Sequence, residues 1–258
     1  MPLWAYASFA FMKEERFFYV PQATKNSALP QEEAGHAVRV LRLKEGDTIF
    51  LIDGEGGIHQ AEVTLASNKK CEYRITESHT SPAPQFPTTI HIAIAPTKMM
   101  ERMEWMAEKA TEIGIDELSF LESQYSERRT MRSDRIEKTV ISAMKQSRKA
   151  WKPVINDLMP LKDFLDTPRE GRKFICHCHN EIPRKDLYNE ILAHKGDTSQ
   201  QYVTILIGPE GDFSKEEVQY ALEHGYESVS LGESRLRTET AALVALMTIR
   251  LGNTTNKI

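Results

Sequence analysis

The two parts of this chain differ in how hydrophobic and polar positions alternate. Between residues 16 and 79, short runs of β-branched and aromatic residues are separated by turn signals such as KEGD and DGEGG. One helical stretch, residues 32–42, interrupts them, and its apolar side chains share one face, which leaves Arg39 and Arg42 available to solvent. This part predicts a small β-barrel or β-sandwich with one helix.

Beyond residue 88, apolar runs alternate with segments of helical periodicity. The pattern predicts helices at 99–113, 133–149, 214–225 and 238–251, and strands at 89–96, 116–121, 173–178, 202–208 and 226–231. Strands that alternate with helices are typical of an α/β domain with a largely parallel sheet. The predicted fold class is therefore α/β.

A proline-rich run separates the two parts. Residues 81–87, SPAPQFP, hold three prolines in seven positions and show no periodicity, as expected of a linker. We therefore expect one domain at 12–80 and a second at 88–258. Residues 1–11 lack the basic start of a signal peptide and fall short of the roughly 20 residues that span a bilayer, so we expect a flexible extension and no membrane insertion.

Composition and charge narrow the class of protein. With 40% hydrophobic residues the chain can bury a core without metal, and three cysteines are too few for a disulfide framework, which favours a reducing cytoplasm. The net charge of -4 excludes a basic protein of the histone type. Residues 123–153 nevertheless hold nine basic and three acidic residues, so this segment is either a solvated helical face or a surface for an anionic partner.

The loop after the apolar run 203–207 is the first candidate for chemistry. Residues 208–211 are Gly-Pro-Glu-Gly, and a strand that runs into such a loop places backbone amides and a carboxylate at the carboxyl edge of the sheet, where α/β domains bind ligands. Ser214 and Glu217 form a capping box that starts the next helix. An ordinary β-turn before a capped helix explains the same residues equally well.

A second candidate lies between the predicted strand 226–231 and the helix that starts at Thr238. That helix is apolar on most sides, which predicts deep burial. Arg235 and Arg237 lead into it beside Glu239, and burying such charges without partners is costly. We therefore expect the arginines to bind neighbouring groups, a ligand or a second subunit.

Two further patterns do not support a site. Cys176-His177-Cys178-His179 offers metal-binding residue types, but strand alternation sends the cysteines to one face and the histidines to the other, so no zinc site and no metal are expected. The glycine-rich run 53–57 lacks a following helix and predicts a hairpin turn rather than a dinucleotide site.

Six separated motifs in order carry a resemblance to a known family. They are HAVRVLRLKEGD at 36–47, RMEWMAEKATEIGI at 102–115, SERR at 126–129, QS at 146–147, IGPEG at 207–211 and LGESRLRTETAALVA at 231–245. In these segments, and over nearly the whole length from Met12, the chain resembles the RsmE family of the SPOUT superfamily. Members of that family are bacterial RNA methyltransferases that modify uracil N3 in 16S ribosomal RNA.

The resemblance implies a fold, a cofactor and an assembly. A PUA-like β-barrel at the N-terminus would help to grip RNA, and a SPOUT domain with a deep trefoil knot would follow. S-adenosylmethionine would lie in the knot, and similar enzymes are homodimers with each site at the subunit interface. The implied cofactor cradle is Gly208, Pro209, Glu210, Gly211, Leu231, Gly232, Leu236, Arg237 and Thr238, with the strand end near His179 as a third wall.

The implied reaction is methylation of uridine N3 on the assembled 30S subunit. Arg237 would stabilise the anion that develops on the base, and Glu239 or Glu210 would remove the proton or orient the arginine. Phosphates would be held by Arg39, Arg42, Arg128, Arg129, Lys145 and Arg148. The alternative is a non-catalytic RNA-binding ribosome-assembly factor with the same fold.

Four positions depart from the family pattern, and one of them is Lys149, which stands where an arginine is usual. Asp212 stands where the family has the last glycine of GPEGG, and it adds a carboxylate where close backbone approach is usual. Ser234 and Arg235 stand in the segment LGxRILR, which shifts a charge by one position and favours Arg237 over Arg235. Asp212 is the best support for the non-catalytic alternative.

Overall fold

The computed structural model describes residues 15–67, 69–81, 86–194 and 201–253. It divides into two compact units, Met1–Pro84 with Met144–Lys152, and Gln85–Ala143 with Pro153–Ile258. The predicted extension 1–11 lies outside the described residues, as do positions 82–85 of the predicted linker. Both therefore stay predictions.

The first unit is built on a four-stranded sheet in the order β1-β2-β3-β4, in which β1 and β2 are parallel and the other pairs antiparallel. Its elements are β1 (Phe17–Tyr19), the short 3-10 helix η2 (Ala23–Lys25), α1 (Gln31–Arg39), β2 (Thr48–Ile52), β3 (Gly57–Ala66) and β4 (Cys71–Thr80). Among the described residues no ladder joins β1 to β4. The sheet is therefore open where the sequence predicted a barrel or a sandwich.

The helix of this unit covers the core of the sheet. Ala34 and Ala37 of α1 are buried against the inward side chains of the strands. The helix ends at Arg39, three residues before the predicted end, and Arg42 has a φ of 54°. That left-handed conformation cannot continue a right-handed helix.

A segment distant in sequence completes the first unit. The amide of Lys152 donates to the carbonyl oxygen of Gly54 over 2.9 Å, and the amide of Gly56 donates to that of Ala150 over 3.0 Å. Gly56 has a φ of 100°, and a Cβ there would lie 2.6 Å from a backbone oxygen. The sequence pattern assigned residues 144–152 to the second domain, because contacts with a strand some 100 positions away leave no periodic signal.

The second unit confirms the α/β class with a parallel sheet. Its strands run in the order β7-β6-β5-β10-β8-β11-β9, and every pairing is parallel. They are β5 (Thr89–Ile94), β6 (Glu117–Glu122), β7 (Val154–Pro160), β8 (Arg172–Cys176), β9 (Lys185–Asp186), β10 (Tyr202–Ile207) and β11 (Glu227–Ser230). The central strands β5 and β10 are apolar along their length because both faces of the sheet are covered.

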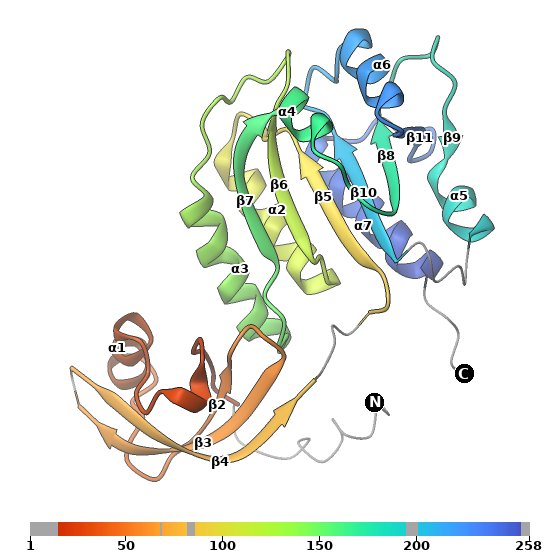
Figure 1. The fold of residues 1–258 in the computed structure, drawn as a ribbon. Helices are drawn as coiled ribbons and strands as arrows, with labels where there is room; N and C mark the ends of the chain where they lie inside the picture. The colour runs from red at the N-terminus through yellow and green to blue at the C-terminus, as the bar shows by residue number, and fades with distance from the viewer. Residues whose placement is uncertain (1–14, 68, 82–85, 195–200, 254–258) are drawn as a thin grey trace. The chain divides into compact units, whose positions relative to one another are not determined.

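Helices cover this sheet on its two faces (Figure 1). They are α2 (Met100–Ile113), α3 (Ser133–Ser147), α4 (Leu161–Asp166), α5 (Leu187–Ala193), α6 (Lys215–Glu223) and α7 (Thr238–Asn253). Helix α7 packs on α2, α5, β5 and β10, whereas α4 and α6 enclose a second core cluster that includes Phe164 and Phe213. The result is a three-layer unit.

Within the single chain, the last helix is not buried on most sides as predicted. One stripe of α7 is buried, but Met247 is 40% and Leu251 63% exposed. Among the described residues, no helix combines the length and the apolar character needed to cross a bilayer.

Strand register brings four strand ends to one edge of the sheet. Ile207 at the end of β10 pairs with Ile94 of β5 and with Cys176 of β8, and Val229 of β11 also pairs with Cys176. Because parallel strands share a direction, the segments that follow these four strands emerge together. This edge is where we look for a candidate functional site.

Candidate active site

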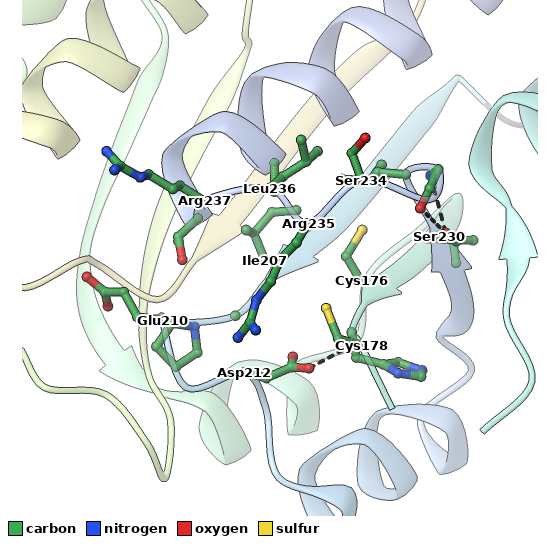
Figure 2. A pocket seen from close by; sticks show the side chains of 18 of the residues that line it. Cys176, Cys178, Ile207, Glu210, Asp212, Ser230, Ser234, Arg235, Leu236 and Arg237 are labelled. Atoms are coloured by element: carbon green, nitrogen blue, oxygen red, sulfur yellow. Dashed lines mark hydrogen bonds between the residues drawn. The ribbon is translucent and has the colours of Figure 1, made fainter. Parts of the chain in front are cut away.

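A cavity of about 470 Å³ lies at this carboxyl edge (Figure 2). It is walled by the segments that follow β8, β10 and β11 and by the first turns of α2 and α7. All nine residues that the resemblance assigned to the cofactor cradle line this one cavity. The structure therefore brings them together from two loops of the sequence.

The loop after β10 forms the first wall. The amide of Asp212 donates to the carbonyl oxygen of Pro209 over 2.9 Å, which closes a turn with Glu210 and Gly211 at its centre. A Cβ on Gly208 would lie 3.2 Å from the Phe213 backbone, a tight contact that would require Phe213 to shift. The Glu210 carboxylate accepts from the amide of Lys98 over 3.1 Å and ties the turn to the segment after β5.

The loop after β11 forms the second wall. Gly232 has a φ of 105°, and the hydroxyl of Ser230 accepts from its amide over 3.2 Å. Arg235 and Arg237 are both exposed in the single chain, so their expected binding to a ligand or a second subunit stays a prediction. Arg235 extends toward the loop that carries Asp212, whereas Arg237 extends away from it (Figure 2).

Glu239 lies beside the cavity rather than on its wall. Its side chain is 8% exposed, its Oε1 is 3.8 Å from Nε of Arg102, and its Oε2 has no hydrogen-bond partner among the described residues. Arg102 does line the cavity. The sequence analysis did not identify Arg102. A cation in the first turn of a helix is disfavoured by the helix dipole, and this unusual position could have indicated a functional role.

The third wall follows β8, which ends at Cys176 and not at residue 178 as predicted. Strand alternation therefore stops there, and His177 lines the same cavity as Cys176 and Cys178, contrary to the predicted separation of faces. His179 lies behind the wall, where its Nε2 is 2.8 Å from the carbonyl oxygen of Phe213. No group of three or more metal-binding side chains occurs in the described part of the chain.

The His177 ring is held in a neutral state. It is 4% exposed, and its Nε2 lies 2.9 Å from the Ser228 hydroxyl. Burial lowers the pKa of His177 to about 4, against the opposing effect of Asp212. The ring is therefore uncharged near neutral pH and contributes a polar wall rather than a cation.

Basic side chains dominate the charge of the cavity. A further arginine that the sequence did not suggest, Arg184, donates to the carbonyl oxygen of His177 over 2.8 Å and lines the third wall. Four arginines and two carboxylates line the cavity: Arg102, Arg184, Arg235, Arg237, Glu210 and Asp212. Such a wall suits a ligand or substrate that carries or develops negative charge.

In the second unit, two predicted RNA-binding arginines are already engaged by the protein. Arg128 donates through Nε to the carbonyl oxygen of Thr97 over 3.0 Å and also to that of Lys98. Arg129 pairs with Glu122. Arg128 thus holds the segment after β5 in place. The Lys98 amide of that segment contacts Glu210 in the cavity loop after β10.

The four predicted RNA-binding residues of the first unit fall into two groups. Lys145 pairs with Glu33 and Arg148 with Glu15, each over 2.6 Å. The other two, Arg39 and Arg42, are exposed and form no ion pair with a described residue. The local excess of basic residues is therefore partly compensated by carboxylates from elsewhere in the chain.

Comparison with known proteins follows the division into two units. Residues 84–250 match the family model of the RNA methyltransferase domain, and residues 29–76 match that of the RNA methyltransferase PUA domain. The first match alone spans more than half of the chain.

Similar proteins cover nearly the whole chain. A probable rRNA-methyltransferase from Porphyromonas gingivalis is 43% identical and has a TM-score of 0.81 over 92% of this chain and 98% of its own. A ribosomal RNA small subunit methyltransferase E from Neisseria gonorrhoeae, solved with S-adenosyl methionine, is 26% identical with a TM-score of 0.76 over 92% of this chain and 98% of that one. The protein of the same name from Rickettsia conorii is 28% identical over 93% of this chain and 96% of its own.

These findings confirm the resemblance that the six motifs carried. Both domain models match in the order expected of that family, and relatives from several bacteria share its name. The chain belongs to the RNA methyltransferase family in which a PUA domain is joined to a methyltransferase domain.

Proposed function

We propose that the protein transfers a methyl group from S-adenosylmethionine to N3 of a uridine in 16S ribosomal RNA. The observation that carries the proposal is that all nine cradle residues line one cavity at the carboxyl edge. Relatives named ribosomal RNA small subunit methyltransferase E and a similar structure with bound S-adenosyl methionine support the donor and the substrate.

The residues of the cavity fit this donor. A volume of about 470 Å³ lies in the range of small-molecule sites. Ile207, Leu231 and Leu236 offer apolar contacts for an adenine ring, and the turn Pro209–Asp212 offers backbone groups. When bound, S-adenosylmethionine supplies an electrophilic methyl group on a sulfonium centre.

The protein's part in the reaction is to orient the base and to stabilise charge. Uracil N3 must lose its proton, and Arg237, exposed at the cavity, stabilises the negative charge that appears on O2 or O4. Glu239 holds Arg102 rather than contacting the base, since it is buried beside the wall. Glu210 is exposed on the wall and is the carboxylate placed to accept the proton.

Uridine N3 lies on the pairing edge, so the target nucleotide must be unpaired or swung out of its helix. The exposed Arg39 and Arg42 of the PUA unit hold phosphates of the surrounding RNA, together with Arg128, Arg129, Lys145 and Arg148 once the RNA displaces their present partners.

The proposal extends to fold and assembly. The two loops that wall the cavity, after β10 and β11, are the segments that form a deep trefoil knot, and the first unit is a PUA-like domain built on the open four-stranded sheet. The exposed Met247 and Leu251 on α7 and Trp105 on the adjacent α2 support a homodimer that covers these side chains. The enzyme acts in the cytoplasm on the assembled 30S subunit.

The decisive experiment is transfer of labelled methyl to 30S subunits that lack the native modification. Mass spectrometry of the digested RNA should show 3-methyluridine, and naked 16S RNA should be the poorer substrate. Donor binding with methylation of another nucleotide would overturn the assigned base.

A second candidate is an assembly factor that binds RNA without catalysis. The carboxylate of Asp212 at the donor wall is the feature that favours it. Binding to 30S subunits without donor binding or methyl transfer would establish that function instead.

A further inference from the structure

The Asp212 side chain joins two walls of the cavity. Its Oδ2 accepts a hydrogen bond from the amide of Cys178 over 2.7 Å (Figure 2). Its Oδ1 accepts a hydrogen bond from the amide of Phe213 over 2.8 Å. Cys178 belongs to the segment after β8, and Asp212 to the loop after β10. Both carboxylate oxygens are therefore occupied by backbone donors, one from each wall.

The backbone of Asp212 has a conformation that is unfavourable for most residues other than glycine, so its side-chain hydrogen bonds have an energetic role. Its φ of 68° lies in the left-handed region, which side chains with a Cβ adopt at a cost. Aspartate tolerates that region better than most residues because its short side chain can bond nearby backbone groups. The two hydrogen bonds offset a strain that glycine would not have.

A second contact joins the same two segments. His179 Nε2 is 2.8 Å from the carbonyl oxygen of Phe213, and the Phe213 ring is fully buried in the core between α4 and α6. The two walls are thus fastened to each other at adjacent positions and to the core. Fastening of this kind fixes the shape of a cavity before a ligand arrives.

We propose that Asp212 is a positioning residue, which holds the loop after β10 against the segment after β8 and so preforms the cavity for the methyl donor. The identity of that ligand rests on the proposed function. Because amide donors engage both oxygens, Asp212 acts by position and not by proton transfer. On this proposal the Asp212 carboxylate serves donor binding, and the measurement of donor affinity separates this role from the non-catalytic alternative.

The test is donor affinity, measured by calorimetry with the full chain and S-adenosylmethionine. Asp212→Gly removes the carboxylate but accepts the positive φ, so the variant should fold and bind the donor about tenfold more weakly. Asp212→Asn keeps one acceptor oxygen and should recover part of the loss. In methyl transfer, the KM for the donor should rise while kcat at saturation stays within about threefold of the wild type.

The first unit offers a matched control. Asp53 also accepts from two backbone amides, those of Glu55 and Gly57, each over 2.8 Å. Asp53→Gly removes the same number of hydrogen bonds in the unit that does not contain the cavity, and donor affinity should be unchanged. An equal loss in both variants would overturn a specific role for Asp212.

Amide hydrogen exchange without donor supplies a second readout. In Asp212→Gly, amide exchange should be faster in the two loop segments, residues 176–180 and 209–214. It should be unchanged in the strands of the sheet. Wild-type donor affinity in Asp212→Gly would overturn the proposal, as would unchanged exchange in these segments. If the wild-type chain bound no S-adenosylmethionine, the proposed function would fail, whereas the exchange comparison would still decide whether Asp212 holds the two walls together.

Discussion

The Nε atom of Arg102 lies 3.8 Å from Oε1 of Glu239, and this pair joins the first turns of α2 and α7 beside the cavity. Arg102 reaches the cavity wall, whereas Glu239 is almost fully buried with its second oxygen unpartnered among the described residues. The carboxylate therefore depends on the arginine for its solvation. Changing either residue affects both stability and the position of a cavity cation.

Removing the arginine of this pair should destabilise the protein more than neutralising the carboxylate. Arg102→Met leaves Glu239 buried and uncompensated, so the free energy of unfolding should decrease by about 1–3 kcal/mol. Glu239→Gln removes the buried charge itself and should cost less. In the double variant most of the loss from Arg102→Met should be recovered, as measured by urea denaturation. Strictly additive losses would show that the two side chains do not interact.

Arg237 should be required for methyl transfer but not for folding. Because its side chain is exposed, Arg237→Ala should unfold at the wild-type temperature. The rate of 3-methyluridine formation should fall by about 10² to 10³, the usual effect of losing one group that stabilises an oxyanion. Arg235→Ala, at the neighbouring exposed arginine, should have a smaller effect. Wild-type turnover in folded Arg237→Ala would remove this residue from the mechanism.

Acid should destabilise the second unit through His91 of β5. Burial, with a smaller contribution from Arg169, lowers the pKa of His91 to about 3, and the ring stays neutral while its Nε2 contacts the Ser119 hydroxyl over 2.7 Å. The histidine of the unfolded chain has a pKa of about 6.5. Between pH 6.5 and 3 the unfolded state therefore binds a proton that the folded state does not, and stability is lost as pH falls through this window.

The size of this effect can be measured from the pH dependence of urea unfolding. One such histidine contributes a slope of up to about 1.4 kcal/mol per pH unit within that window. His91→Gln should lose this part of the slope, although its stability at pH 7 should be lower than that of the wild type. The same substitution at His36, which is exposed on α1, should leave the slope as it is.

RNA binding should depend on salt and on the exposed arginines of the first unit. Arg39→Gln and Arg42→Gln should each weaken binding to 16S RNA and lower the slope of log affinity against log salt by about 1, the effect of one lost phosphate contact. Lys70→Gln changes an exposed cation that is paired with Glu72 in the same unit and serves as the control. Unchanged slopes in both arginine variants would exclude this surface from the RNA interface.

Local features of the fold were predictable because they depend on residues a few positions apart. The end of α2 at Gly114, with a φ of 110°, and the capping box of Ser214 and Glu217 both appear as predicted. The apolar runs of β5 and β10 likewise signalled buried parallel strands. By contrast, the strand β7 was not predicted. It lies at the edge of the sheet and contains Asn156 and Asp157, and because an edge strand needs no continuous apolar run, its sequence lacks the hydrophobic pattern of a strand.

The sequence by itself determined the α/β class, the two loops of the cradle and the family resemblance, since periodicity, turn chemistry and motif order are all properties of neighbouring residues. The tertiary structure decided which side chains from distant parts of the sequence come together, both at the cavity and elsewhere. Arg102, Arg184 and Cys178 join the cavity, and Lys145 finds Glu33, through contacts between residues far apart in the chain. The exposure of Arg235 and Arg237 was decided in the same way, because burial depends on what packs against a segment and not on the composition of that segment.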